Sequence, residues 1–136
     1  MQDFRKLDVW KRAHELTVQL YQSTVGASDR PFPGLIAQMR RAAASIPANI
    51  AEGCGHASQA ELARFLQHAI ASASELEYHL LLAHDLKLIP SAAYARLDAR
   101  TTQTRQMLIG LVRKVRAQRK PLTPLSRRPV ESPLDA

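Results

Sequence analysis

Apolar side chains recur every three or four positions along most of the chain. This spacing places them on one face of an amphipathic helix, whereas a strand would need alternation with period two, which no long segment shows. The sequence therefore predicts an all-α protein with four helices. Their apolar stripes are Val9, Ala13, Leu16 and Leu20; Ile36, Met39, Ala43, Ile46 and Ile50; Leu62, Phe65, Leu66, Ala69, Ala73, Leu76, Leu80 and Ala83; and Tyr94, Leu97, Thr101, Leu108, Leu111 and Val115.

Capping and turn residues indicate where the first two helices begin and end. Asp8 is placed to accept the first free N–H groups of the first helix, which should end before Gly26. Pro33 can occupy the first turn of the second helix, where its missing N–H is not needed. Gly53 and Gly55 can adopt the positive φ angles that end this helix.

The third helix has a capping-box signature at its start. The Ser58 side chain can accept from the Glu61 N–H while the Glu61 side chain reaches back to Ser58. Pro90 closes this helix, and Ser91 can cap the fourth, which should run to about residue 119.

Short connections between four amphipathic helices predict an antiparallel up-down-up-down four-helix bundle over residues 1–120. The first and third helices then begin at the end of the bundle where the second and fourth terminate. Residues 121–136 hold four of the eight prolines and few large apolar side chains, so we expect a flexible tail. The third helix is so apolar over residues 79–89 that a single bundle should leave hydrophobic surface for self-association to cover.

Pro47 interrupts the second predicted helix with a residue that has no N–H to donate to the carbonyl of Ala43. The helix either ends at Ser45 or continues with a bend, and the unbroken apolar stripe favours a bent, continuous helix. Its many alanines allow neighbouring backbones to approach closely. Ser45, Asn49 and Glu52 share a polar stripe, and a side chain from it or from a neighbouring helix can satisfy the freed carbonyl.

Composition and charge restrict the class of protein further. A chain of 136 residues with 46% hydrophobic residues fits one domain. Cys54 is the one cysteine, so neither an internal disulfide nor a cysteine zinc site is expected. No apolar run approaches the roughly 18 residues of a membrane span, and we expect a cytoplasmic protein without membrane contact. The net charge of +7 favours anionic partners.

Much of the positive charge falls where the bundle brings two helix ends together. The helix dipole favours cations at the end of the fourth helix and so explains part of the charge there without a ligand. It disfavours cations at the start of the first helix, so the cations at that start are the stronger indication of a binding role. We expect the cluster to bind phosphate backbones, with base-specific readout less favoured because aromatic residues are few. The predicted nucleic-acid-binding residues are Arg5, Lys6, Lys11, Arg12, Arg113, Lys114, Arg116, Arg119 and Lys120.

Candidate catalytic or metal-binding patterns are weak. The paired Glu-x-x-His spacing of di-iron bundles is missing. Glu75 with His79, and His84 with Asp85, are better explained as solvated helix faces. Ser45 and Ser58 have no histidine partner that the sequence identifies, so we expect no enzymatic activity, no cofactor and no metal. Arg40 and Arg41 lie in mid-helix. Arg40 falls roughly opposite residue 71, within about a turn of Glu75, so an interhelical or intersubunit ion pair is expected.

Three segments of the chain resemble a known family. "FRKLDVWKRAHEL", "QMRRAAASIPANIAEGCG" and "ELARFLQHAIASASELE" are similar to the bacterial four-helix-bundle proteins encoded by intervening sequences of 23S rRNA genes, a family that includes the accessory variability determinant of diversity-generating retroelements. The similarity covers roughly residues 4–115. The positions that match are Leu7, Val9, Trp10, Arg40, Arg41, Ser45, Ile46, Pro47, Asn49, Ile50, Glu52, Gly53 and Glu77, whereas His56 stands where relatives often have Arg.

The resemblance implies a ring of five bundles with no known catalysis. Its basic surface, in the retroelement branch, engages a reverse transcriptase and nucleic acid. In this interpretation Trp10, Arg40, Arg41, Ser45, Pro47, Asn49, Glu52 and Gly53 form a structural or oligomer motif. The sequence thus predicts a non-enzymatic homo-oligomer, most simply a pentamer, that presents a basic surface to RNA, DNA or a nucleic-acid enzyme. The alternative is an adaptor that binds a protein partner and has no nucleic-acid role.

Overall fold

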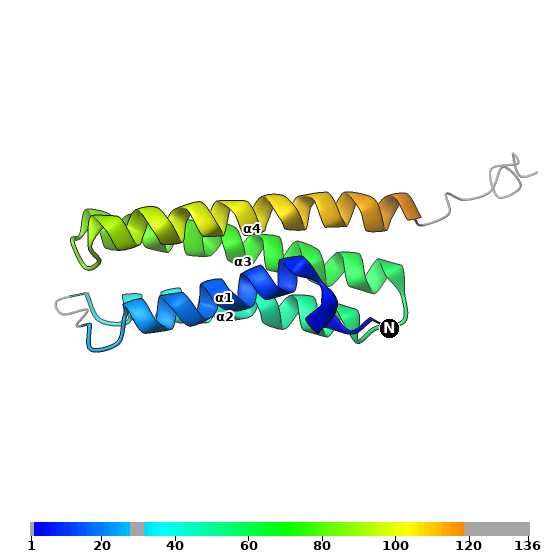
Figure 1. Ribbon diagram of the computed structural model, residues 1–136, viewed down its shortest axis with the longest axis horizontal. Coiled ribbons are helices and arrows are strands. Elements are labelled where there is room, and N and C mark those ends of the chain that lie inside the picture. Colours follow the sequence, from blue (N-terminus) through cyan, green and yellow to red (C-terminus); the bar gives the residue numbers. More distant parts are fainter. Residues whose placement is uncertain (1, 28–31, 119–136) are drawn as a thin grey trace, which may run out of the picture.

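The computed structural model describes residues 2–27 and 32–118. Four long helices pack as an antiparallel up-down-up-down bundle, as Figure 1 shows, so the predicted fold is confirmed. A short 3-10 helix precedes them, which the sequence pattern did not indicate. The elements are η1 (Phe4–Lys6), α1 (Asp8–Ser23), α2 (Leu35–Cys54), α3 (Gln59–Asp85) and α4 (Ser91–Gln118). The predicted tail, residues 121–136, lies outside the described residues.

The core is built from the predicted apolar stripes. Every stripe residue of α1, α2 and α3 is buried, whereas Tyr94 and Leu111 of α4 are half-buried. Each fully buried leucine or isoleucine contributes about 1.5–3 kcal/mol through the hydrophobic effect, so these stripes dominate the stability of the bundle. Thr101 is buried among them and satisfies its hydroxyl by donating to the Leu97 carbonyl oxygen at 2.7 Å.

The helix α2 passes through Pro47 without a break, so the prediction of a continuous helix is confirmed. The Ala43 carbonyl oxygen, which Pro47 leaves without its usual donor, accepts from Thr17 Oγ1 of α1 at 3.0 Å. The same hydroxyl lies 2.8 Å from the Ala13 carbonyl oxygen, so the two acceptors share one proton. A side chain of the neighbouring helix α1 therefore supplies the hydrogen bond that the Pro47 backbone cannot donate, which is one of the two sources predicted from the sequence.

The polar stripe of α2 meets α3. Ser45 Oγ lies 2.8 Å from Ser72 Oγ, and the Asn49 side-chain amide donates to both the Ser45 carbonyl oxygen and Ser45 Oγ, at 2.8 and 2.9 Å. Ser45 and Asn49 thus form a polar contact within one bundle, while Glu52 of the same stripe is exposed.

Three predicted terminal features of α1 and α2 are wrong. Asp8 is the first residue of α1 rather than its cap: Leu7 occupies the N-cap without a side-chain bond, and η1 fixes the entry of the chain instead. Pro33 precedes the N-cap of α2, which is Gly34 in a left-handed conformation with φ 93°. Gly53 lies inside α2 and the φ of Gly55 is −74°, so neither ends the helix through a positive φ.

The connection between α3 and α4 is a turn of a different kind from the one predicted. The helix α3 ends at Asp85, before Pro90. Lys87 has φ 60°, its N–H donates to the His84 carbonyl oxygen at 3.0 Å, and the Leu88 N–H donates to the Ala83 carbonyl oxygen at 2.8 Å. This is a Schellman arrangement with lysine at the position that glycine usually occupies.

The predicted cap at the start of α4 is also wrong. Ser91 is the first residue of α4 rather than its cap, and its Oγ lies 3.5 Å from His84 Nε2. The Pro90 carbonyl oxygen accepts from the Tyr94 N–H at 2.9 Å, so backbone bonding begins the helix.

Candidate nucleic-acid interface

The start of α1 and the end of α4 lie side by side at one end of the bundle (Figure 1). Leu7 and Val9 line a shallow apolar groove opposite Met107 and Leu111, with Lys114 at its edge. The Gln2 N–H donates to the Cys54 carbonyl oxygen at 3.0 Å and so ties the N-terminal segment to the end of α2. The contact predicted between the two basic segments is therefore present.

Seven of the nine predicted cations belong to the described residues, and all seven are exposed; they are Arg5, Lys6, Lys11, Arg12, Arg113, Lys114 and Arg116, which we call the basic cluster. Arg119 and Lys120 lie outside the described residues. One member, Arg5, forms an ion pair, with Asp3 at 3.6 Å. Within residues 2–27 and 32–118, no carboxylate pairs with the other six.

The basic cluster extends along α1 and α4 rather than being confined to the tip of the bundle. Arg12 Nη1 lies 3.5 Å from Gln103 Oε1 of α4. Position 103 precedes Arg113 by about 15 Å of helix axis at a rise of 1.5 Å per residue. The cations of the basic cluster are therefore distributed along the two helices.

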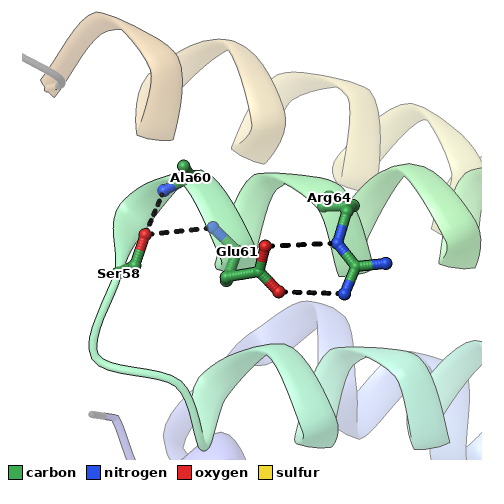
Figure 2. A network of polar contacts seen from close by, with 4 residues as sticks. All are labelled: Ser58, Ala60, Glu61 and Arg64. Carbon is green, nitrogen blue, oxygen red and sulfur yellow. Dashed lines mark hydrogen bonds and ion pairs between the residues drawn. The ribbon is translucent and has the colours of Figure 1, made fainter.

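Sequence reasoning missed one further exposed cation at this end, Arg64 near the start of α3. Arg64 donates to Glu61 through both Nε and Nη2, at 3.3 and 2.9 Å, as Figure 2 shows. Hydrogen bonding to Arg64 lowers the pKa of the Glu61 carboxyl group. The spacing of the two residues, i and i+3 on a helix, is the signal that could have identified the pair.

The predicted capping box at the start of α3 is half correct. Ser58 Oγ accepts from the Ala60 and Glu61 N–H groups at 3.1 and 3.3 Å (Figure 2). Glu61 does not reach back to Ser58, because its carboxylate is engaged by Arg64 in the opposite direction along the helix. The charged hydrogen bonds to Arg64 replace the expected bond to a neutral N–H.

Two groups of aromatic and cationic side chains accompany the basic cluster. On η1 and α1, Phe4 packs edge-on against Trp10 at a ring-centroid distance of 4.9 Å, and Trp10 stacks on His14 at 4.9 Å with the planes 6° apart. Arg5 lies over the Phe4 ring at 4.7 Å. Trp10 is half-buried against the core.

The second group surrounds Phe65, which is 8% exposed. His56 stacks on its ring at 5.1 Å, His68 lies at its edge at 5.8 Å, and the Arg64 guanidinium lies over it at 4.5 Å. His56 therefore packs against an aromatic ring beside an arginine of α3.

Among the described residues, Arg40 does not form the interhelical ion pair expected near Glu75, and an ion pair between subunits stays a prediction. Arg40 Nε donates to Thr24 Oγ1 at 2.9 Å, and its guanidinium lies over the Tyr21 ring at 4.8 Å. Arg40 therefore fastens α2 to the C-terminal end of α1, where the helix dipole favours a cation. Arg41, which is exposed, lines the same polar groove as Glu75.

Other charged groups have structural partners. Glu77 of α3 pairs with Arg105 of α4 at 2.9 Å and accepts from Thr102 Oγ1 at 3.3 Å. His84 Nδ1 lies 3.4 Å from Asp85.

Across the described residues, no three His, Cys, Asp or Glu side chains come together in a way that could hold a metal ion. None of the helices of this part of the chain is long and apolar enough to cross a membrane.

The fold and the basic cluster define the chain as a basic, all-α four-helix-bundle protein. The family model described as 23S rRNA-intervening sequence protein matches residues 5–110, and the chain belongs to this family. Comparison with functionally characterised proteins gives no significant match.

A solved structure supports the same assignment. The chain is similar to a protein of unknown function from the S23 ribosomal protein family of Bacteroides thetaiotaomicron, with 27% sequence identity and a TM-score of 0.69. The match covers 76% of this chain and 97% of that one, so the likeness extends over nearly the whole Bacteroides protein.

Proposed function

We propose that this protein is a non-enzymatic homo-oligomer that binds the phosphate backbone of RNA or DNA through the basic cluster. The observation that carries the proposal is the exposure of seven cations on η1, α1 and α4 with a single carboxylate partner among them. Cations that lack a carboxylate partner can replace the counterions of a nucleic acid without first breaking an ion pair. The net charge of +7 adds long-range attraction.

Self-association is the second part of the proposal. Tyr78 and Leu81, on one face of α3, are 59% and 44% exposed, and burying them against another copy would be favourable. A ring of five is the assembly that the family resemblance implies. Several copies would present several basic clusters to one strand, which raises the effective concentration of each cluster.

The same exposed face of α3 also supports the alternative role, an adaptor for a protein partner. A reverse transcriptase is the partner class that the resemblance suggests, and the cytoplasm is the expected location. Under this alternative, the basic cluster serves solubility and electrostatic steering alone. Binding to generic RNA separates the two roles because only the first requires it.

The test compares two variants that lose equal charge. Lys11→Gln with Lys114→Gln removes two members of the basic cluster, and Lys87→Gln with Arg96→Gln removes two exposed cations outside it. We expect only the first variant to weaken RNA binding across sequences. It should also flatten the plot of log affinity against log salt by about 0.7 per lost single-strand phosphate contact. Equal behaviour of the two variants, or no binding by the wild type, would reject the nucleic-acid role.

The oligomer is tested by mass in solution. Light scattering at micromolar concentration should give a multiple of the 15.1 kDa chain mass, in both charge variants as well as in the wild type. A monomer at this concentration would reject self-association.

A further inference from the structure

We propose that the stacked rings of Phe4, Trp10 and His14 form a platform on which an unpaired nucleobase stacks, so that the preferred ligand is single-stranded nucleic acid. This inference rests on the proposed function, because the basic cluster must first hold the strand. It adds a contact to the base where the basic cluster contacts only phosphate.

The geometry of the three rings supports a platform that is open at one end. Phe4 covers one side of Trp10 edge-on, and His14 lies nearly parallel to Trp10, with the planes 6° apart. Phe4 and Trp10 are half-buried against the core, whereas His14 is exposed. The packed rings hold the imidazole in place, and its exposed side can receive a further flat ring.

The cations around the platform fit a strand that stacks a base there. Arg5 lies over the Phe4 ring at 4.7 Å with a side chain that is 71% exposed, and Lys11 follows Trp10 directly in α1. Single-strand-binding proteins combine aromatic rings that stack bases with cations that follow the backbone. Because every base has a flat face, such stacking tolerates any sequence, which agrees with the expectation that base-specific readout is less favoured than backbone binding.

A duplex cannot use the platform in the same way, since its bases are already stacked and paired. The basic cluster would still hold duplex phosphates, but the contact with His14 would be lost. The structure therefore favours single strands over duplexes of equal charge.

The experiment uses the full chain and two probes, a short oligouridine and an abasic phosphodiester of the same length. Three variants separate ring from charge: His14→Ala removes the ring, His14→Lys replaces the ring with a cation, and His14→Phe keeps a flat ring. We expect His14→Ala and His14→Lys to bind oligouridine about tenfold more weakly, and His14→Phe to bind it as the wild type does. The wild type, His14→Ala and His14→Phe should bind the abasic probe equally, and His14→Lys, which adds a cation beside the basic cluster, should bind it at least as tightly.

Trp10 is the one tryptophan of the chain, so its fluorescence reports on the platform directly. Oligouridine should change its emission, and the abasic probe should not. Unchanged emission, with equal binding of both probes by the wild type, His14→Ala and His14→Phe, would overturn the platform and leave the phosphate-binding role intact. If neither probe binds the wild type, the proposed function fails as well.

Discussion

Gly53 of α2 lies so close to α3 that a Cβ atom at position 53 would come within 2.9 Å of the Phe65 Cβ. The Leu62 Cδ1 atom would lie 3.2 Å away. Glycine is therefore required at this position for the close approach of two helices, and not for a special backbone angle. The contact sits where α2 turns into α3, beside the basic end of the bundle.

Gly53→Ala should lower the free energy of unfolding by about 1–3 kcal/mol, because the added methyl group forces the two helices apart. Urea unfolding measures the change. Gly110→Ala is the matched control, since a Cβ there meets nothing within 4 Å and alanine has the higher helix propensity. The control should gain about 0.5–1 kcal/mol. If Gly53→Ala leaves the free energy of unfolding unchanged, the two helices separate at little cost.

The bond from Thr17 to Ala43 predicts a coupling between two helices. Thr17→Val removes the hydroxyl that serves the carbonyl freed by Pro47, and should cost about 1 kcal/mol of unfolding free energy. In a Pro47→Ala background the new N–H at position 47 can serve Ala43, so the same change should cost less. A double-mutant cycle by urea unfolding measures the difference. If Thr17→Val lowers the free energy of unfolding equally in the wild-type and Pro47→Ala backgrounds, the Thr17 hydroxyl does not compensate for the N–H that Pro47 lacks.

The sequence predicted the helices well because burial follows apolar periodicity. It also predicted the continuity of α2 through Pro47, since Ile46 and Ile50 continue the stripe and are fully buried. The helix ends were harder. Nothing local distinguishes a glycine that packs, such as Gly53, from one that ends a helix.

The position and exposure of the cations in the basic cluster were predicted from the same periodicity, whereas their binding role stays a prediction. Exposed cations at helix ends can be read from the pattern, and the bundle topology fixes which ends meet. The partners of individual charges depend on tertiary distances, which the sequence pattern does not give. Arg40 contacts Thr24 and Tyr21 within the chain rather than a carboxylate. Arg64 was not predicted as a site residue, although Glu61, its ion-pair partner, lies one helical turn before it.

Lys87→Gly should stabilise the protein by up to about 1 kcal/mol, because Lys87 has a φ of 60° at the end of α3 and glycine adopts this conformation without steric cost. Thermal unfolding gives the change. Lys87→Ala serves as the control, since it removes the same charge but keeps the Cβ atom. A gain in both variants would point to charge as the cause.

The thiol of Cys54 should be unreactive in the folded protein. Cys54 is 1% exposed, and burial raises its pKa, so the thiolate that reacts with labelling reagents is scarce and inaccessible. Because the folded pKa is raised, the stabilising effect of the neutral thiol is complete below the ordinary thiol pKa and is lost as pH rises through the folded value. Labelling kinetics should accelerate steeply with urea.

A matched thiol on the surface provides the comparison. Ala57→Cys in a Cys54→Ala background places the thiol at an exposed position in the connection between α2 and α3. It should react rapidly without urea. Equally rapid reaction of native Cys54 would show that this end of the bundle opens readily.

Glu61→Gln should strengthen nucleic-acid binding, because it frees the Arg64 guanidinium at the basic end and adds one positive charge. The ion pair is exposed, so the variant should change unfolding free energy little. The slope of log affinity against log salt should become steeper, by an amount that corresponds to at most about one additional phosphate contact per copy. Asp85→Asn, which makes the same charge change at the opposite end of the bundle, is the control and should leave affinity nearly unaltered.

Acidification should reproduce this effect in the wild type. Hydrogen bonding to Arg64 lowers the pKa of Glu61, so the carboxylate stays charged to a lower pH than an ordinary glutamate. As pH falls through that lowered value, the pair is lost and Arg64 becomes available. Affinity should therefore rise more in the wild type than in Glu61→Gln, whose amide does not titrate. Parallel pH profiles for the two proteins would show that Arg64 takes no part in binding.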